Sequence, residues 1–228
     1  MNDITPNRAS VLASLLDERY SCRGYLPQSV PRATIDRILA LAQRTASWCN
    51  SQPWQAHVLS AAATRRTREE LLAHVATHEP QPDLQFPEAY VGLSLERRRE
   101  CGWQLYQATG VVRGDKPGAD RQRLENFRFF GAPHVAIITS DAPLGTYGTI
   151  DCGAYVANFM LAARALGVAS IAQAALASHS AFWRQQLSLV NDRKVVCGIS
   201  FGYEDSTHPA NSFRTSRAPA SQVVHWVD

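Results

Sequence analysis

The stretch from Gly145 to Gly167 constrains the fold more than any other part of the sequence. Small and apolar residues, among them Ala154, Phe159 and Leu166, surround almost the whole circumference of the helix that this stretch predicts. A surface helix keeps one polar face, whereas a helix that is apolar all round is buried. We therefore expect a long central helix that is buried on nearly all sides, with part of it available to pack against another subunit.

Short apolar runs predict a sheet around this helix. Four runs have the length and the branched residues of strands, at residues 55–60, 134–139, 168–174 and 194–203. Helical patterns accompany them at residues 7–18, 31–46, from Thr64 onward, 93–109, and from Ser178 to about residue 189. No repeat and no flexible linker interrupts the chain, so one α+β domain over residues 1–228 is the economical interpretation.

A polar and aromatic insertion occupies about residues 79–126 of this domain. Prolines break the chain at its start, and residues 110–119 are expected to form a loop after the helix at 93–109. The insertion carries Tyr90, Trp103 and Tyr106. It either covers a pocket as a lid or packs as a helical excursion, and the sequence leaves both alternatives open.

Charge and cysteine content exclude several classes of partner. Lys and Arg number 23 against 20 Asp and Glu, and no basic stripe forms, so we expect no nucleic-acid partner. No apolar run approaches the roughly 20 residues of a membrane span, and the N-terminus lacks the pattern of a secretory signal. The five cysteines are odd in number and scattered, which argues against a disulfide framework and predicts the reducing cytoplasm.

A metal site is not expected. His74 and His78 stand one helical turn apart, as paired metal ligands would. The sequence offers no Glu or Cys that completes the set of ligands that a zinc site needs. We therefore predict no metal.

The stretch from Ala46 to Trp54 is the first candidate binding element. It places Ser, Asn and Gln side chains beside two tryptophans within nine residues. A plain surface loop would carry glycine and charge here instead. Hydrogen-bonding groups next to flat apolar rings suit a planar heteroaromatic ligand, and we expect such a ligand at this stretch.

Arginines near the N-terminus form a second candidate. Arg19 and Arg23 bracket the hydroxyl of Ser21, and a guanidinium offers a rigid donor fork for phosphate. The sequence therefore suggests an anion clamp. Two arginines at a helix end also interact favourably with the helix dipole, so a purely structural role stays open.

The tail from residue 211 to residue 228 carries further arginines, Arg214 and Arg217. It also carries late apolar residues, Val223, Val224 and Trp226. Apolar residues so close to the end are expected to pack on something, such as the edge of a partner's sheet.

Four elements of the sequence together resemble one family. The first two are Arg19-Tyr20-Ser21-Cys22-Arg23 and Ala46-Ser47-Trp48-Cys49-Asn50-Ser51-Gln52-Pro53-Trp54. The others are Gly167-Val168-Ala169-Ser170, which leads to Gln173-Ala174-Ala175, and Ser216-Arg217-x-Pro219. In this order they resemble the FMN-dependent nitroreductase family over almost the full length of the chain. The insertion is most similar to the branch that reduces nitroaromatic compounds such as nitrobenzoates.

Two positions depart from the pattern of that family. Ala46 stands where the family usually has proline, which loosens the loop but removes no ligand group. Ala174 and Ala175 stand where many relatives have glycine or an acidic residue. How the backbone approaches the flavin at this point is therefore left open.

The resemblance implies a fold and an assembly. The fold is a nitroreductase-like α+β domain with a central, mostly antiparallel sheet flanked by helices. A long buried helix and a C-terminal arm, which is exchanged between subunits, would form the contact of a homodimer. One FMN molecule would lie in each of two sites at the interface.

The resemblance also implies which residues contact FMN. Arg19 and Arg217 would hold the phosphate, while Ser21 and Arg23 would reach the pyrimidine side of the ring. The loop from Ser47 to Gln52 would arrive from the other subunit, and backbone near Gln173 would lie against the central ring. The implied cofactor-binding residues are Arg19, Tyr20, Ser21, Arg23, Ser47, Trp48, Cys49, Asn50, Gln52, Gln173, Ala174, Ala175 and Arg217.

The implied activity is the reduction of nitroaromatic compounds, from nitro to hydroxylamino, or of quinones. NAD(P)H and the oxidant would use the same face of the flavin in turn, with hydride passing through N5 in a ping-pong reaction, so no catalytic side chain is expected. The sequence has no Gly-x-Gly-x-x-Gly, so NAD(P)H is expected to bind transiently.

Several alternatives remain beside this interpretation. Within the same fold, the chain could be an enone reductase, a flavin-dependent dehydrogenase or a dehalogenase. A non-enzymatic flavin-binding protein is the alternative of another class. The sequence does not identify the physiological substrate, the preference for NADH or NADPH, or the residues of the insertion that line the substrate pocket.

Overall fold

The centre of the computed structural model, which describes residues 7–227, is a four-stranded sheet with the order β1-β2-β4-β3. Its strands are β1 (Trp54–Leu59), β2 (His134–Asp141), β3 (Ala169–Gln173) and β4 (Arg193–Gly202). All three pairs of neighbouring strands are antiparallel. The predicted strands and the predicted antiparallel sheet are confirmed.

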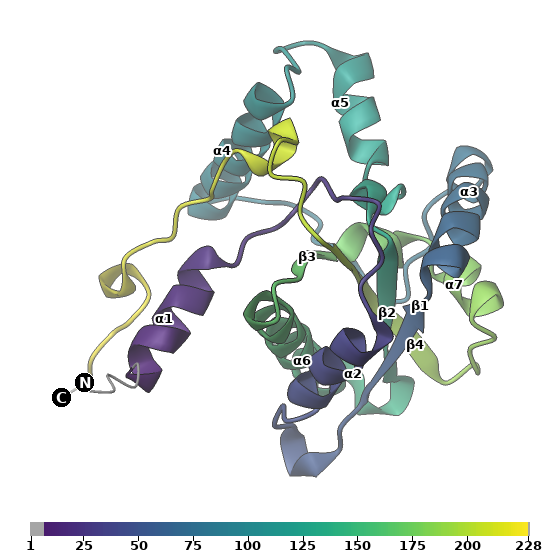
Figure 1. The fold of residues 1–228 in the computed structure, drawn as a ribbon, viewed down its shortest axis with the longest axis vertical. Coiled ribbons are helices and arrows are strands. Elements are labelled where there is room, and N and C mark those ends of the chain that lie inside the picture. Colours follow the sequence, from purple (N-terminus) through teal and green to yellow (C-terminus); the bar gives the residue numbers. More distant parts are fainter. Residues whose placement is uncertain (1–6, 228) are drawn as a thin grey trace.

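Helices cover both faces of this sheet (Figure 1). They are α1 (Arg8–Glu18), α2 (Arg32–Ala42), α3 (Ala61–Thr77), α4 (Gly92–Ala108), α5 (Lys116–Leu124), α6 (Gly145–Ala165) and α7 (Ser180–Gln186). Helices α2 and α6 lie on one face and α3 and α7 on the other, while α4 and α5 stand beside the sheet, close to the tail. Among residues 7–227, no helix has the length and apolar character needed to cross a membrane.

Strand β2 explains how two helical layers share one sheet. Side chains alternate between the faces of a strand, and here both sets are apolar. Val135 and Ile137 join the buried cluster under α3 and α7, whereas Ala136 and Ile138 join the cluster under α2 and α6. The continuous apolar run in the sequence therefore reflects a strand that is covered on both sides.

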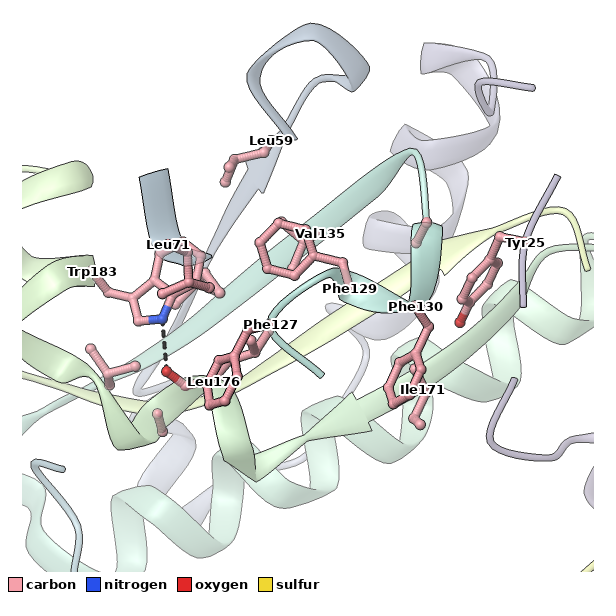
Figure 2. Packing of buried hydrophobic residues seen from close by; sticks show 14 of the residues in the cluster. Tyr25, Leu59, Leu71, Phe127, Phe129, Phe130, Val135, Ile171, Leu176 and Trp183 are labelled. Atoms are coloured by element: carbon pink, nitrogen blue, oxygen red, sulfur yellow. Dashed lines mark hydrogen bonds between the residues drawn. The ribbon is translucent and has the colours of Figure 1, made fainter. Parts of the chain in front are cut away.

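Six of the seventeen buried residues in the cluster under α3 and α7 are aromatic (Figure 2). Phe129 and Trp183 are fully buried there. The indole Nε1 of Trp183 donates a hydrogen bond of 2.7 Å to the carbonyl oxygen of Leu176. This bond satisfies the polar atom that the ring brings into the core, and it joins α7 to the turn that follows β3.

Helix α6 is buried on the side that packs against the sheet. Its buried residues include Tyr155 and Phe159. On the opposite side, Tyr147 and Ile150 are each 57% exposed. The expected burial on nearly all sides is not met within one chain, because Trp48, whose ring centre lies 4.5 Å from that of Tyr147, leaves more than half of Tyr147 and Ile150 exposed.

Several boundaries differ from the predictions for local reasons. Helix α3 begins before Thr64, because the side chain of Ser60 accepts a hydrogen bond from the amide of Ala63 and forms the cap. Helix α5 begins inside the expected loop, because Asp115 caps it through the amide of Gly118. Helix α7 begins at Ser180, since Ser178 bonds back to the preceding turn.

His134 joins three segments at the start of β2. It is 4% exposed, and its Nε2 accepts a hydrogen bond of 3.1 Å from the amide of Val30. Its Nδ1 lies 3.2 Å from the carbonyl oxygen of Leu59. Because Nε2 accepts, the ring is neutral and Nδ1 carries the hydrogen that it donates to Leu59. Burial lowers the pKa of His134 below 6.5, against the weaker opposing effect of the Leu59 carbonyl.

We expect acid to destabilise the protein partly through this residue. Since the pKa of His134 is lower in the folded chain, its contribution to stability is complete above pH 6.5 and is lost as the pH falls. Urea unfolding between about pH 7.5 and pH 5.5 measures this loss as a decrease in the free energy of unfolding. The His134→Gln variant should show a smaller decrease than the wild type, and an equal decrease in both would contradict the assignment.

Candidate functional site

A cavity of about 470 Å³ brings both ends of the sequence together. It lies between the end of α1, the segment that follows it, α4 and the tail. Its positive wall consists of Arg19, Arg23, Arg214 and Arg217. The remaining lining residues are Leu16, Asp17, Tyr20, Ser21, Cys101, Phe213 and Thr215. The N-terminal and C-terminal arginines of the sequence analysis therefore share one cavity, which we call the arginine cavity.

The segment from Arg19 to Arg23 is fixed to β3 on one side. The amide of Cys22 donates a hydrogen bond of 3.2 Å to the carbonyl oxygen of Ser170, and Ser21 forms a parallel bridge with the same residue. The segment thus lies beside β3 at the edge of the sheet. It runs parallel to β3 and therefore antiparallel to β4. Its backbone is held while its side chains reach the cavity.

Asn211 fixes the other side of this segment. Its Oδ1 accepts a hydrogen bond of 2.7 Å from the amide of Arg23, and its Nδ2 donates one of 2.9 Å to the carbonyl oxygen of Gly24. Gly24 itself has no room for a side chain, because an added Cβ would lie 2.2 Å from the ring of His208. Asn211 therefore connects the tail to the N-terminal segment, a role that no local pattern in the sequence indicates.

The arginine cavity carries excess positive charge, since four arginines line it together with the single carboxylate of Asp17. Burial, and then the charge of Arg217, lowers the pKa of Arg19. Burial also lowers the pKa of Arg23, whose guanidinium lies 5.8 Å from the centre of the Phe213 ring. The ion pairs found within residues 7–227 do not include any of the four arginines. A cavity of this kind attracts an anion.

Tyr20 lines the same cavity and supports Arg214. The guanidinium carbon of Arg214 lies 3.5 Å from the centre of the Tyr20 ring, and the Tyr20 hydroxyl donates to Glu204 at 3.2 Å. Burial raises the pKa of Tyr20, so the phenol stays protonated and acts as a donor. Its ring thus forms a platform for one of the cavity's cations.

The start of β3 lies beside the Arg19–Arg23 segment, since Ser170, the second residue of the strand, bridges to Ser21. The side chain of Gln173 points away from solvent: its Nε2 donates 2.9 Å to the carbonyl oxygen of Asn126, and its Oε1 accepts from the hydroxyl of Ser200. Ala174 is exposed and Ala175 is half-buried. A ligand at this edge would therefore meet the backbone after Gln173 and not the Gln173 side chain.

The polar loop from Ser47 to Gln52 lies elsewhere in the chain. It precedes β1, and β1 and β3 are the two outer strands of the sheet. Figure 1 shows this loop at the bottom of the view, at the opposite end of the molecule from α4. The structure therefore does not bring Ser47, Trp48, Cys49, Asn50 or Gln52 to the arginine cavity of their own chain.

The same loop has an unusual backbone. Cys49, Asn50 and Gln52 have positive φ angles of 51°, 55° and 46°. Such a conformation costs on the order of 1–3 kcal/mol for a residue other than glycine and persists only where the surroundings hold it. Here Ser47 Oγ accepts a hydrogen bond of 2.9 Å from the amide of Gln52, and Asp151 on α6 accepts one of 3.1 Å from the amide of Trp48.

Cys101 is a residue of the cavity that the sequence analysis missed. It lies on α4, in the insertion, and it also lines an adjoining cavity of about 480 Å³ with Arg217 and Gln104. A lone cysteine in a helix gives no sign of such a position. A helical pattern fixes which residues share a face, but not which other segment that face meets.

His74 and His78, which were predicted not to form a metal site, make a stacked pair. The rings of His74 and His78 have centres 4.0 Å apart, and the buried ring of His179 contacts His74 edge-on at 5.3 Å. No group of three His, Cys, Asp or Glu residues within the described part of the chain is arranged to hold a metal ion.

Comparison with known proteins gives a consistent result. The model of the nitroreductase family matches residues 16–203. The chain is 36% identical over 225 residues to nitroreductase NfnB of Mycolicibacterium smegmatis, covering 97% of this chain and 95% of that protein. It is 34% identical over 219 residues to the 4-nitrobenzoate reductase of Nocardioides sp., covering 92% and 87%.

A solved structure resembles this one closely. It is that of the FMN-dependent nitroreductase NfnB from Mycobacterium smegmatis in complex with NADPH. The two superpose with a TM-score of 0.92 at 34% identity, over 97% of this chain and all of the other.

We expect the arginine cavity to bind a simple phosphate anion. Inorganic pyrophosphate added to protein freed of small molecules should raise the thermal midpoint by about 2–4 °C for each kcal/mol of binding. The Arg19→Gln variant should gain less, because one of the four cations is removed. Chloride at the same ionic strength is the control, and an equal gain from chloride would contradict a specific site.

Proposed function

Since this chain belongs to the nitroreductase family, we propose that it is an FMN-dependent oxidoreductase that uses NAD(P)H to reduce nitroaromatic compounds. One observation carries the proposal: Arg19 and Arg217, near opposite ends of the sequence, line a single cavity. This is the arrangement that the family resemblance requires for the phosphate of FMN.

The residues of the arginine cavity fit the phosphate group. Four guanidinium groups surround about 470 Å³, and no carboxylate within residues 7–227 forms an ion pair with them. Arginine presents its donors as a planar fork that matches phosphate oxygens. When bound, FMN supplies the hydride and electron chemistry of the reaction, and the protein contributes binding, orientation and charge.

Individual side chains have distinct roles in this proposal. Arg19 and Arg217 hold the phosphate, and Tyr20 keeps Arg214 in the cavity wall. Ser21 and Arg23 contact the polar edge of the flavin ring. Arg23 is a partly buried cation, so it favours the arrival of negative charge on the ring next to it. The exposed backbone at Ala174 and Ala175 completes the support for the ring.

We propose that the functional unit is a homodimer. The loop residues Ser47, Trp48, Cys49, Asn50 and Gln52 then contact the FMN of the neighbouring subunit. Three features support this: the loop lies at the opposite edge of the sheet from the arginine cavity, one face of α6 is open, and the described part of α1 buries none of its residues. The tail adds Trp226, which is 88% exposed, as an arm that packs on the partner.

The insertion at about residues 79–126 belongs to this single domain of residues 1–228 and covers part of the site. Support comes from Cys101 of α4, which lines the arginine cavity. Tyr90 and Trp103 are 43% and 41% exposed, so aromatic surface is available near the same helix. The five cysteines are all free, as expected for a protein that functions in the reducing cytoplasm.

Purification and two assays test the function. The protein should be yellow, NADPH or NADH should bleach the colour without a second substrate, and 4-nitrobenzoate should restore it. A colourless protein that fails to bind added FMN would end the proposal. Faster turnover of an α,β-unsaturated ketone than of 4-nitrobenzoate would instead assign an enone reductase. Bound flavin that neither nucleotide bleaches would indicate a flavin-binding protein without turnover.

The Arg217→Ala variant should bind FMN about 2 kcal/mol more weakly, which corresponds to about a 30-fold higher Kd, because one charged partner of the phosphate is lost. Fluorescence titration of the protein freed of flavin measures the Kd. Arg32→Ala is the matched control, since Arg32 lies on α2 and its side chain is 85% exposed. Equal affinity in the two variants would show that the tail is misassigned.

Asn50→Ala should lower flavin occupancy through the loss of a side chain that contacts the neighbour's FMN. Alanine at a positive φ also strains the backbone, so Asn50→Gly is tested beside it. Glycine keeps the φ of 55° without strain but lacks the amide. Both variants should lose affinity. A loss in the alanine variant alone would assign the effect to the backbone and not to the side chain.

A further inference from the structure

Arg193 is almost completely buried, at 5% exposure, although it carries a charge. It is the first residue of β4. Charged side chains are seldom buried unless their surroundings pair with them and accept their hydrogen bonds. The partners of Arg193 therefore indicate what the residue is for.

The guanidinium of Arg193 connects the root of the polar loop to the sheet. One Nη donates 3.0 Å to the carbonyl oxygen of Pro53 and 2.8 Å to that of Thr139. Its Nε donates 3.0 Å to the hydroxyl of Thr139. The other Nη pairs with the carboxylate of Asp141, at the end of β2.

Pro53 is the residue between the polar loop and β1. Its carbonyl oxygen is the last backbone acceptor of the loop before the ladder of β1 and β2 begins at Trp54. The bond from Arg193 to this carbonyl fixes the point from which the loop leaves the sheet. Asn50 and Gln52, which have positive φ angles, come just before Pro53 in the sequence. A shift at Pro53 would therefore move the side chains of the polar loop.

We propose that Arg193, held in place by Asp141, is a positioning residue for FMN binding in the partner's site. It acts through Pro53 on the loop that contains Trp48 and Asn50, and it touches neither the cofactor nor the substrate. The inference rests on the proposed function, because it takes the loop to contact the flavin of the neighbouring subunit.

Arginine is suited to this position for a geometric reason. The fork donates to the loop, to the backbone and side chain of Thr139, and to a carboxylate at the same time, whereas a lysine ammonium is a point charge on a flexible stem. The contacts also lie beside the irregularity in the pairing of β2 with β4, between Ile138 and Thr139. Beyond the irregularity the pairing continues to Asp141 and Arg193, so the two side chains that pair with each other stand opposite one another at the end of the ladder.

The Arg193→Lys and Asp141→Asn variants test this role. Both variants should fold, since each keeps a polar group at its position. Both should also raise the Kd for FMN. The expected increase for Arg193→Lys is between about tenfold and a hundredfold. The expected increase for Asp141→Asn is smaller, because Arg193 remains and only its charge partner is lost. Unchanged affinity in Arg193→Lys would overturn the proposal.

A matched control separates positioning from general loss of stability. Val195 is fully buried and lies two residues along the same strand, so Val195→Ala should lower the thermal midpoint without moving the loop. The Kd for FMN is then compared between Val195→Ala and Arg193→Lys under conditions in which both variants have lost the same stability. If Val195→Ala weakens FMN binding as much as Arg193→Lys does, the effect of Arg193 is only structural and the proposal fails.

A mixed dimer tests whether the effect acts across the interface. One subunit carries Arg193→Lys and the other Arg217→Ala, and differently tagged chains allow the mixed species to be isolated. If the loop serves the partner's site, one site combines both defects while the other is normal. The mixed dimer should then bind one FMN with wild-type affinity and a second one very weakly.

The other outcomes are distinct. Two weakened sites and no normal one would place the loop in the site of its own chain and overturn the proposal. A wild-type protein that binds no FMN would instead remove the proposed function itself. A wild-type protein that binds FMN as a monomer would reject the shared site, and with it the role of Arg193.

Discussion

The site depends on the way the segment from Arg19 to Arg23 is held. One side of this segment bonds to Ser170 at the edge of the sheet, and the other bonds to Asn211 in the tail. These few hydrogen bonds bring arginines that are almost 200 positions apart into one cavity. The like charges there repel one another, so the cavity is assembled against an electrostatic cost that a bound anion would remove.

The order of the strands has an equally direct consequence. The arginine cavity adjoins β3 and the polar loop leads into β1, and the two strands form opposite edges of the sheet. No small rearrangement of one chain brings these two elements together. The open face of α6 and the exposed arm of the tail agree with this separation. The proposed homodimer would bring the polar loop of one chain to the arginine cavity of the other.

Most of the fold could be predicted from the sequence because apolar periodicity decides it locally, as in β2 and α6. Boundaries failed where a single cap decides them, as Ser60 and Asp115 do. The motifs located Arg19 and Arg217, but only the tertiary structure places Cys101 beside them. The buried bonds of Gln173 and the bonds of Arg193 to the loop root could not be predicted either, because they depend on segments that are distant in sequence.

Helix α1 ends at Glu18, and Arg19 is its C-terminal cap. Within the described residues of one chain, this helix buries none of its side chains, and a helix of eleven residues is marginal in water without tertiary support. A subunit separated from the proposed homodimer would therefore tend to unwind at this end and release one of the cations of its own cavity. Retention of the cofactor would then depend on protein concentration, so that dilution alone would empty the enzyme.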